Sequence, residues 1–187
     1  MRFAVVDLET TGGQPKDDRI IEIGIVLIDG DKIVNTYESL VYPGRFIPPF
    51  VQNLTGIFPE MVESAPPFME LAETVYELLE GRVFVAHNAP FDFGFLKVEL
   101  GRACCKWDPP RLCTVKLARK VFPGFPSYSL HSLIQSLGCE DFKHHRALGD
   151  AIAAAEVLKL ALGKVGESGV LKEIKNLSAS KVRNYIS

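Results

Sequence analysis

Two acidic side chains follow a short apolar run near the start of the chain. Residues 3–6 are Phe, Ala, Val and Val, and Asp7 and Glu9 come directly after this run. Because side chains of a strand alternate between its two faces, both carboxylates are expected on one face, with Cα atoms about 6–7 Å apart. Two such carboxylates repel each other, and a divalent cation removes the conflict, since magnesium and manganese prefer oxygen ligands. For this pair alone, the alternative to a metal site is an ordinary strand end in which one of the two acids is protonated.

Two further acids lie at the expected starts of helices. Asp92 falls in the first turn of a helix capped by Asn88, where an acid also suits the helix dipole. Asp150 lies five residues after His145, a spacing of about 500° that would put the two on different helix faces. Both can serve one site only if His145 precedes a helix that begins at Ala147, with Asp150 facing the sheet. A histidine so placed can act as a general base, and a packing or surface role is the alternative.

The elements that must position these residues alternate in the manner of an α/β protein. Strands are expected at residues 2–8, 19–28, 32–41, 82–86 and 111–114. Helices are expected at residues 68–79, 88–101, 115–121, 129–137 and 147–162. The first three strands are expected as an antiparallel meander that the prolines at 43, 48 and 49 bring to an end, and Gly163 is expected to end the long helix. The fold class is therefore α/β, with a mixed five-stranded sheet flanked by helices.

The bulk composition excludes disorder and gives no sign of a membrane protein. Of the 187 residues, 47% are hydrophobic and 24% are charged, as in ordinary globular domains. No apolar run approaches the roughly 20 residues that cross a bilayer, and Asp7 comes too early for a signal peptide. The four cysteines form no C-x-x-C pair and are expected to be reduced. A cytoplasmic protein without a membrane partner is the expectation.

The ordered motifs resemble the DEDD exonuclease superfamily in its histidine subgroup (DEDDh), which includes the proofreading (epsilon) subunit of bacterial DNA polymerase III. Residues 5–12 look like the first motif, residues 86–92 like the second and residues 145–150 like the third. Residues 20–24 and 54–57 also sit where the family carries similar segments, and the resemblance covers residues 1–162. It implies a ribonuclease-H-like exonuclease fold with two divalent metal ions, Mg²⁺ or Mn²⁺. It assigns the metals to Asp7, Glu9, Asp92 and Asp150, and the role of general base to His145.

The resemblance also implies a set of residues that hold the terminal nucleotide. These are Thr10, Thr11, Gly12, Leu54, Gly56, His87, Asn88 and Phe91. Phe91 offers a stacking face for a base, and a place in the core is the alternative for Phe91 and Leu54. Lys143, His144 and Arg146 flank the third motif and are candidates to meet phosphates, with solvated charges as the alternative. The formal net charge of −2 would become mildly positive with the cations bound, which predicts modest electrostatic affinity for a strand.

The implied activity is 3′-to-5′ exonuclease action that releases nucleoside monophosphates from single-stranded 3′ ends, with DNA favoured and proofreading or repair as its setting. An exoribonuclease of the RNase T or oligoribonuclease type, a catalytically silent binding module and a ribonuclease-H-type endonuclease stay as alternatives. Residues 1–163 are expected to form the exonuclease domain and residues 164–187 a tail that is partly helical near 170–177. A DNA polymerase III α subunit is a candidate partner. The tail does not support it, because it shows no convincing clamp motif. A free-standing exonuclease is at least as well supported.

Overall fold

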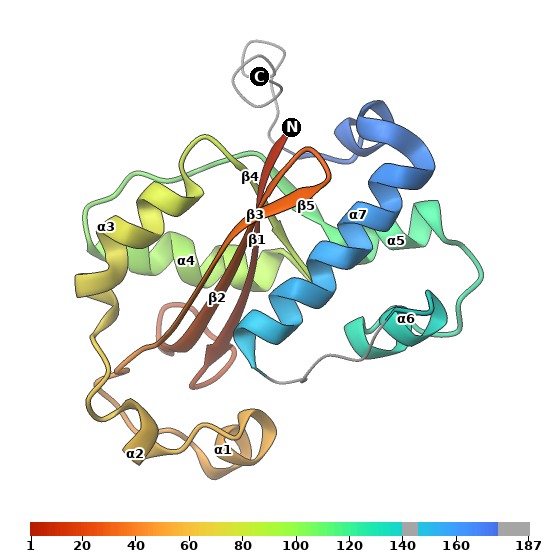
Figure 1. Ribbon diagram of the computed structural model, residues 1–187. Coiled ribbons are helices and arrows are strands. Elements are labelled where there is room, and N and C mark those ends of the chain that lie inside the picture. Colours follow the sequence, from red (N-terminus) through yellow and green to blue (C-terminus); the bar gives the residue numbers. More distant parts are fainter. Residues whose placement is uncertain (140–145, 176–187) are drawn as a thin grey trace.

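A mixed sheet forms the centre of the protein in the computed structural model, which describes residues 1–139 and 146–175 (Figure 1). Its strands are β1 (Arg2–Thr10), β2 (Ile20–Asp29), β3 (Lys32–Leu40), β4 (Val83–Ala86) and β5 (Arg111–Cys113). Within the described ranges the sheet has five strands, in the order β3-β2-β1-β4-β5. β1, β2 and β3 form an antiparallel meander, and β4 and β5 run parallel to β1. The predicted fold class is confirmed.

The parallel strands bring the first two motifs to the same end of the sheet, where β1 and β4 finish. β4 pairs with β1 in the same direction, from Phe3 opposite Val83 to Val5 opposite Val85. The carboxyl ends of the two strands therefore lie side by side, which is where open α/β sheets place their ligands. β2 lies on the other side of β1 and is buried over almost its whole length, as its nearly continuous apolar sequence predicts.

Helices cover both faces of the sheet (Figure 1). α3 (Phe68–Leu79) and α4 (Pro90–Arg102) pack on the face that carries Ala4, Val6 and Leu8. α5 (Thr114–Val121) and α7 (Ala147–Leu171) pack on the opposite face, over Phe3 and Val5. α6 (Leu130–Ser136) packs beside α5 and α7. Since Asp7 and Glu9 continue the row of Phe3 and Val5, they lie on the face that α7 covers.

Two short helices occupy the proline-rich segment after β3. α1 (Pro49–Thr55) and α2 (Pro59–Val62) both begin with proline, which suits the first turn because that turn needs no backbone N–H donor. Neither helix was predicted from the sequence, although Leu54 and Gly56 of this segment were predicted to hold the nucleotide. The helices enclose a small cluster of their own around Ile47, Val51 and Ile57.

Two predicted helix ends are wrong. Asn88 is not the N-cap of α4: it adopts a left-handed conformation with φ of 70°, Ala89 takes the cap position, and no side chain caps the helix. Gly163 does not end the long helix, because α7 continues to Leu171 with non-helical backbone only at Gly166. Of the tail helix expected near 170–177, Val170 and Leu171 belong to α7, whereas residues 172–175 lie beyond its end and Lys175 pairs with Arg111 beside β5. Residues 176–177 lie outside the described residues.

The segment after Gly163 contributes to the core. Val170 is fully buried and Ile174 is nearly so, and both belong to the cluster that includes Phe3 and Leu158. The four cysteines are free thiols. Among residues 1–139 and 146–175, no helix combines the length and apolar character that crossing a membrane requires.

Candidate active site

Three carboxylates from two elements meet at the carboxyl end of β1. One oxygen from each of Asp7, Glu9 and Asp150 lies within 4.8 Å of the other two. Asp7 and Glu9 project from the same face of β1, as their spacing predicts, and Asp150 lies in the first turn of α7. Oxygen atoms at these distances can share a cation as ligands.

Asp92 lies beside this group on the first turn of α4. The residue is 3% exposed; burial raises the pKa of its carboxyl group, and the backbone N–H groups of Asp92 itself and of Leu8 act in the opposite direction. Its position next to β1 is also evident in the electrostatics, because Asp92 raises the pKa of Asp7 more than any other charged residue does. All four acids of the predicted set therefore lie within mutual electrostatic reach.

Burial and the charges of neighbouring carboxylates raise the pKa values of Asp7, Glu9 and Asp92. Burial, and then the charges of Asp92 and Asp150, raise the pKa of Asp7 well above its ordinary value. Burial and Asp150 raise the pKa of Glu9 to about 7, although Arg146 acts in the opposite direction. Burial also raises the pKa of Asp92 well above its ordinary value. The donor set thus fits divalent cations, which prefer carboxylate oxygens. A bound cation would offset both the repulsion between the carboxylates and the unfavourable effect of burying their charge.

A buried acid on β2 fixes the start of α7. Glu22 is 3% exposed and lies opposite Glu9 in the sheet register. Its carboxylate accepts hydrogen bonds from Arg146 Nε at 2.9 and 3.1 Å, and from the backbone N–H of Ala147 at 2.9 Å. Arg146 Nη2 donates to the same carboxylate. Glu22 therefore joins β2 to the turn that carries Asp150.

Gly24 permits the close approach of α7 to the sheet. A Cβ atom at this position would lie 2.3 Å from the backbone carbonyl carbon of Ala147, a distance that real Cβ atoms do not show. The start of α7 thus rests directly on the backbone of β2. Residues 20–24 resemble a segment of the family, but neither Gly24 nor Glu22 was predicted as a site residue. The signal in the sequence was an acid inside the apolar run from Ile20 to Ile28.

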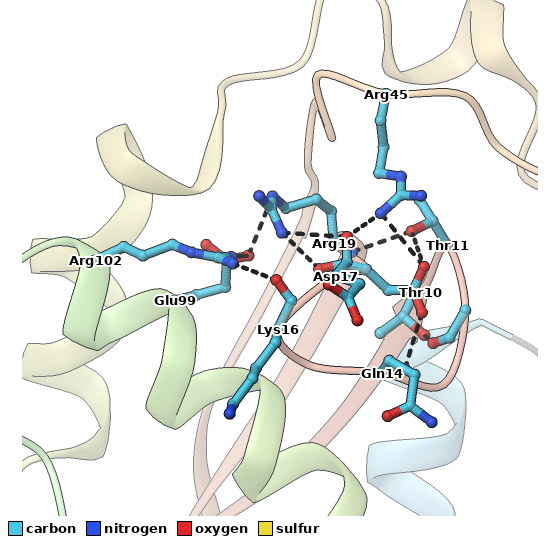
Figure 2. A network of polar contacts seen from close by, with 11 residues as sticks. Thr10, Thr11, Gln14, Lys16, Asp17, Arg19, Arg45, Glu99 and Arg102 are labelled. Atoms are coloured by element: carbon cyan, nitrogen blue, oxygen red, sulfur yellow. Dashed lines mark hydrogen bonds and ion pairs between the residues drawn. The ribbon is translucent and has the colours of Figure 1, made fainter.

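The loop after β1 is held by its own side chains (Figure 2). Thr11 is 1% exposed, and its hydroxyl accepts a hydrogen bond from the backbone N–H of Arg19 at 3.0 Å and donates to Asp18 Oδ1 at 3.3 Å. Thr10 is also buried and donates its hydroxyl to the carbonyl of Gly12 at 2.6 Å. A Cβ at Gly12 would lie 2.5 Å from Asp18, so only glycine fits here without a shift. The two hydroxyls shape the loop.

Figure 2 also shows how this loop is tied to α4. Arg102 forms an ion pair with Glu99 at 2.6 Å and donates to the carbonyl of Lys16 at 2.9 Å. Arg19 lies 3.9 Å from the same Glu99 carboxylate. The loop that follows Asp7 and Glu9 is therefore anchored to the helix that carries Asp92.

The three residues of the second motif that were expected to hold a nucleotide have different environments. His87 places Nδ1 at 2.9 Å from Thr114 Oγ1 and Nε2 at 3.0 Å from the carbonyl oxygen of Tyr128. Burial lowers the pKa of His87, which favours the neutral ring with Nε2 as donor to that carbonyl. Asn88 is exposed, whereas Phe91 is half-buried with its ring centroid 5.0 Å from that of Phe95.

The remaining predicted residues lie on α1, at the start of α7 or outside the described residues. Leu54 lies on α1 and is 55% exposed, and Gly56 caps the end of that helix. Arg146, a candidate to meet phosphates, binds Glu22, and 44% of its side chain surface is exposed. The predicted general base His145, together with Lys143 and His144, falls in residues 140–145, outside those that the structure describes.

Comparisons with known proteins find similar sequences in much longer bacterial proteins. The 3′-5′ exonuclease DinG of Bacillus subtilis is 41% identical over 181 residues, which cover 95% of this chain and 19% of that protein. The DNA polymerase III PolC-type protein of Thermotoga maritima is 38% identical over 188 residues, which cover 96% of this chain and 14% of that protein. The chain thus spans about a fifth or less of the length of these relatives.

A solved structure also matches over nearly its whole length. Exonuclease X in complex with 5′-overhanging duplex DNA superposes with a TM-score of 0.72 and 30% identity, over 88% of this chain and 93% of that one. The predicted ribonuclease-H-like fold and the resemblance to exonucleases are confirmed. The RNase_T family model, described as exonuclease, matches residues 4–158 and so includes all three motifs. This chain therefore belongs to the RNase_T exonuclease family.

Proposed function

We propose that the chain is a 3′-to-5′ exonuclease that releases nucleoside monophosphates from single-stranded 3′ ends, with DNA as the favoured substrate. The observation that carries the proposal is the convergence of Asp7, Glu9 and Asp150 within 4.8 Å, with Asp92 beside them. The names of the relatives support the direction of cleavage, and the DNA bound to Exonuclease X supports the substrate.

The four acids are proposed to hold two divalent cations, Mg²⁺ or Mn²⁺. Bound there, the cations would stabilise the charge that develops on the attacking and leaving oxygens of a phosphodiester. Glu22 holds the backbone of Ala147 and thereby sets the position of Asp150 relative to β1. The proposed general base is His145, a role that rests on the resemblance of the third motif.

The terminal nucleotide is proposed to lie against the loop after β1 and the first turn of α4. The hydroxyls of Thr10 and Thr11 hold the loop, so the backbone from Thr10 to Gly12 is the part proposed to face the nucleotide. Asn88 is exposed and can donate and accept hydrogen bonds, and Leu54 and Phe91 offer apolar contacts. His87 uses both ring nitrogens within the protein, so its proposed part is to support this wall.

The experiment that tests the proposed function compares three single-stranded DNA substrates in magnesium: a linear strand, the same strand with a blocked 3′ end, and a circle. The proposal expects mononucleotides from the free 3′ end and none from the other two. Cleavage of the circle would establish an endonuclease. Asp7→Asn is the control, because equal activity in this variant would show that a contaminating nuclease is responsible.

Matched DNA and RNA strands in the same assay decide the substrate class. Faster shortening of DNA is expected, and shortening of RNA alone would replace the proposal with an exoribonuclease. A DNA polymerase III α subunit as partner stays a prediction. The PolC-type relative supports it only weakly, because the match covers only 14% of that protein's length.

A further inference from the structure

A basic pocket lies at the β5 edge of the sheet, next to the proposed active site. It has a volume of about 650 Å³ and is bordered by β5, the start of α4, α5 and the segment that follows α7. Its charged lining residues are Arg111, Lys116, Arg119, Lys120, Lys175 and Glu173. We refer to this cavity as the basic pocket.

The charge of the basic pocket is opposite to that of the chain. The chain carries a formal net charge of −2, yet within residues 1–139 and 146–175 five basic side chains and one acid line this cavity. The acid, Glu173, is paired with Lys120 at 2.7 Å, which leaves the other cations in excess. Lys116 is exposed on α5, and Arg111 lies 4.0 Å from the centroid of the Phe93 ring. The pocket therefore offers a positive potential to an anion.

The lining of the basic pocket is partly apolar. Ala89, Pro90, Phe93 and Leu112 line it together with the charged side chains. A volume of this size is typical of sites for small organic ligands, which combine apolar walls with a few polar groups. A nucleotide has both chemical parts, because its base can lie against apolar side chains while its phosphate meets lysine and arginine.

The pocket and the acids share one wall, the first turn of α4. Ala89, Pro90 and Phe93 face the pocket, whereas Asp92 is buried and raises the pKa of Asp7 on β1. On the other border, Cys113 lines the pocket and leads into Thr114, which contacts His87 of the second motif. A nucleic-acid strand whose 3′ end lies at the acids thus finds the basic pocket on the other side of the first turn of α4.

We propose that the basic pocket holds a nucleotide unit of the substrate strand, several positions from the 3′ end. This inference rests on the proposed exonuclease function, because it takes the 3′ end to be held at Asp7, Glu9, Asp92 and Asp150. The pocket gives long strands an affinity that very short ones lack, since only a long strand reaches both places.

The test compares Lys116→Ala with Lys32→Ala. Both residues are exposed lysines, and Lys32 lies on β3, at the opposite edge of the sheet. Binding is measured by fluorescence anisotropy in magnesium, with phosphorothioate linkages that resist cleavage, on a strand of roughly 16 nucleotides and on a trinucleotide. Loss of one phosphate contact should weaken binding of the long strand about fivefold at about 0.1 M salt. It should also reduce, by about 0.7, the magnitude of the slope of log K for binding against log salt concentration. Lys32→Ala should change neither value, and the trinucleotide should bind all three proteins alike.

Three results would overturn the proposal. Equal effects of Lys116→Ala and Lys32→Ala would show only a general loss of charge. An equal effect of Lys116→Ala on the trinucleotide and the long strand would place Lys116 at the strand end. Weakened binding of free dAMP in Lys116→Ala, with no change for the long strand, would make the pocket a site for a free nucleotide.

The same proteins separate this inference from the proposed function. If the wild type fails to shorten an unmodified strand while long-strand binding still depends on Lys116, the exonuclease proposal fails and the pocket is supported as a strand-binding site. If the wild type shortens the strand and Lys116→Ala binds normally, the pocket proposal alone fails.

Discussion

Replacing Glu9 with glutamine is expected to flatten the pH dependence of stability in the metal-free protein. Burial and the neighbouring Asp150 raise the pKa of Glu9 from its ordinary value of 4.5 to about 7. Because the folded state binds this proton more tightly than the unfolded chain, the stabilisation is complete below pH 4.5 and is lost as pH rises through about 7. At about 1.4 kcal/mol for each pH unit, the loss amounts to about 3 kcal/mol.

The assay is thermal denaturation in a chelator at about pH 5 and about pH 8. For a domain of this size, about 3 kcal/mol corresponds to a Tm change of roughly 6–12 °C. The wild type should therefore lose that much more Tm than Glu9→Gln does between the two pH values, since glutamine cannot ionise. Glu73→Gln, at an exposed position on α3, is the matched control and should follow the wild type.

Magnesium provides the second part of this experiment. At about pH 8, added Mg²⁺ should raise the Tm of the wild type more than that of Glu9→Gln, because a ligand that binds only the folded state stabilises it according to its affinity. Equal pH profiles for the wild type and Glu9→Gln would refute the reasoning. They would mean that burial and the neighbouring carboxylates do not raise the pKa of Glu9 in the folded protein.

Three further substitutions test the site. Asp7→Asn should abolish strand shortening in a gel assay and should raise the Tm of the metal-free protein at about pH 8, because it removes one of the mutually repelling carboxylates; a lower Tm would contradict this. Glu22→Gln should destabilise the protein by about 2 kcal/mol and lower kcat more than it alters KM, as it loosens the start of α7; steady-state kinetics with an unchanged kcat would speak against that role. Gly24→Ala should destabilise by about 1–3 kcal/mol and weaken Mn²⁺ binding in calorimetry, whereas Gly101→Ala, which meets nothing within 4 Å, should preserve both.

Sequence patterns that depend on one element predicted the positions of several of the acids. Strand alternation placed Asp7 and Glu9 on one face, and the need to bring Asp150 to the sheet predicted a helix that begins at Ala147. These predictions hold because the direction of a side chain follows from backbone geometry over a few residues. The alternation of apolar and turn segments likewise predicted the meander from β1 to β3.

Features that depend on contacts between distant segments were not predictable in this way. Glu22 and Arg146 are 124 positions apart, and nothing local to either residue indicates the other. Gly163 and Gly166 both suit a helix end, and the burial of Val170 in the core accompanies the continuation of α7 past Gly163. Asn88 has the composition of an N-cap, yet the junction between β4 and α4 places it in a left-handed conformation instead.

The most direct test of the central claim is a crystal structure of the protein soaked in Mn²⁺, with the metal located by anomalous scattering. The account predicts two peaks about 3.5–4 Å apart, bound by the carboxylates of Asp7, Glu9, Asp92 and Asp150. Manganese bound elsewhere, or these carboxylates without any peak in crystals of a protein that degrades strands in the same Mn²⁺ solution, would contradict it.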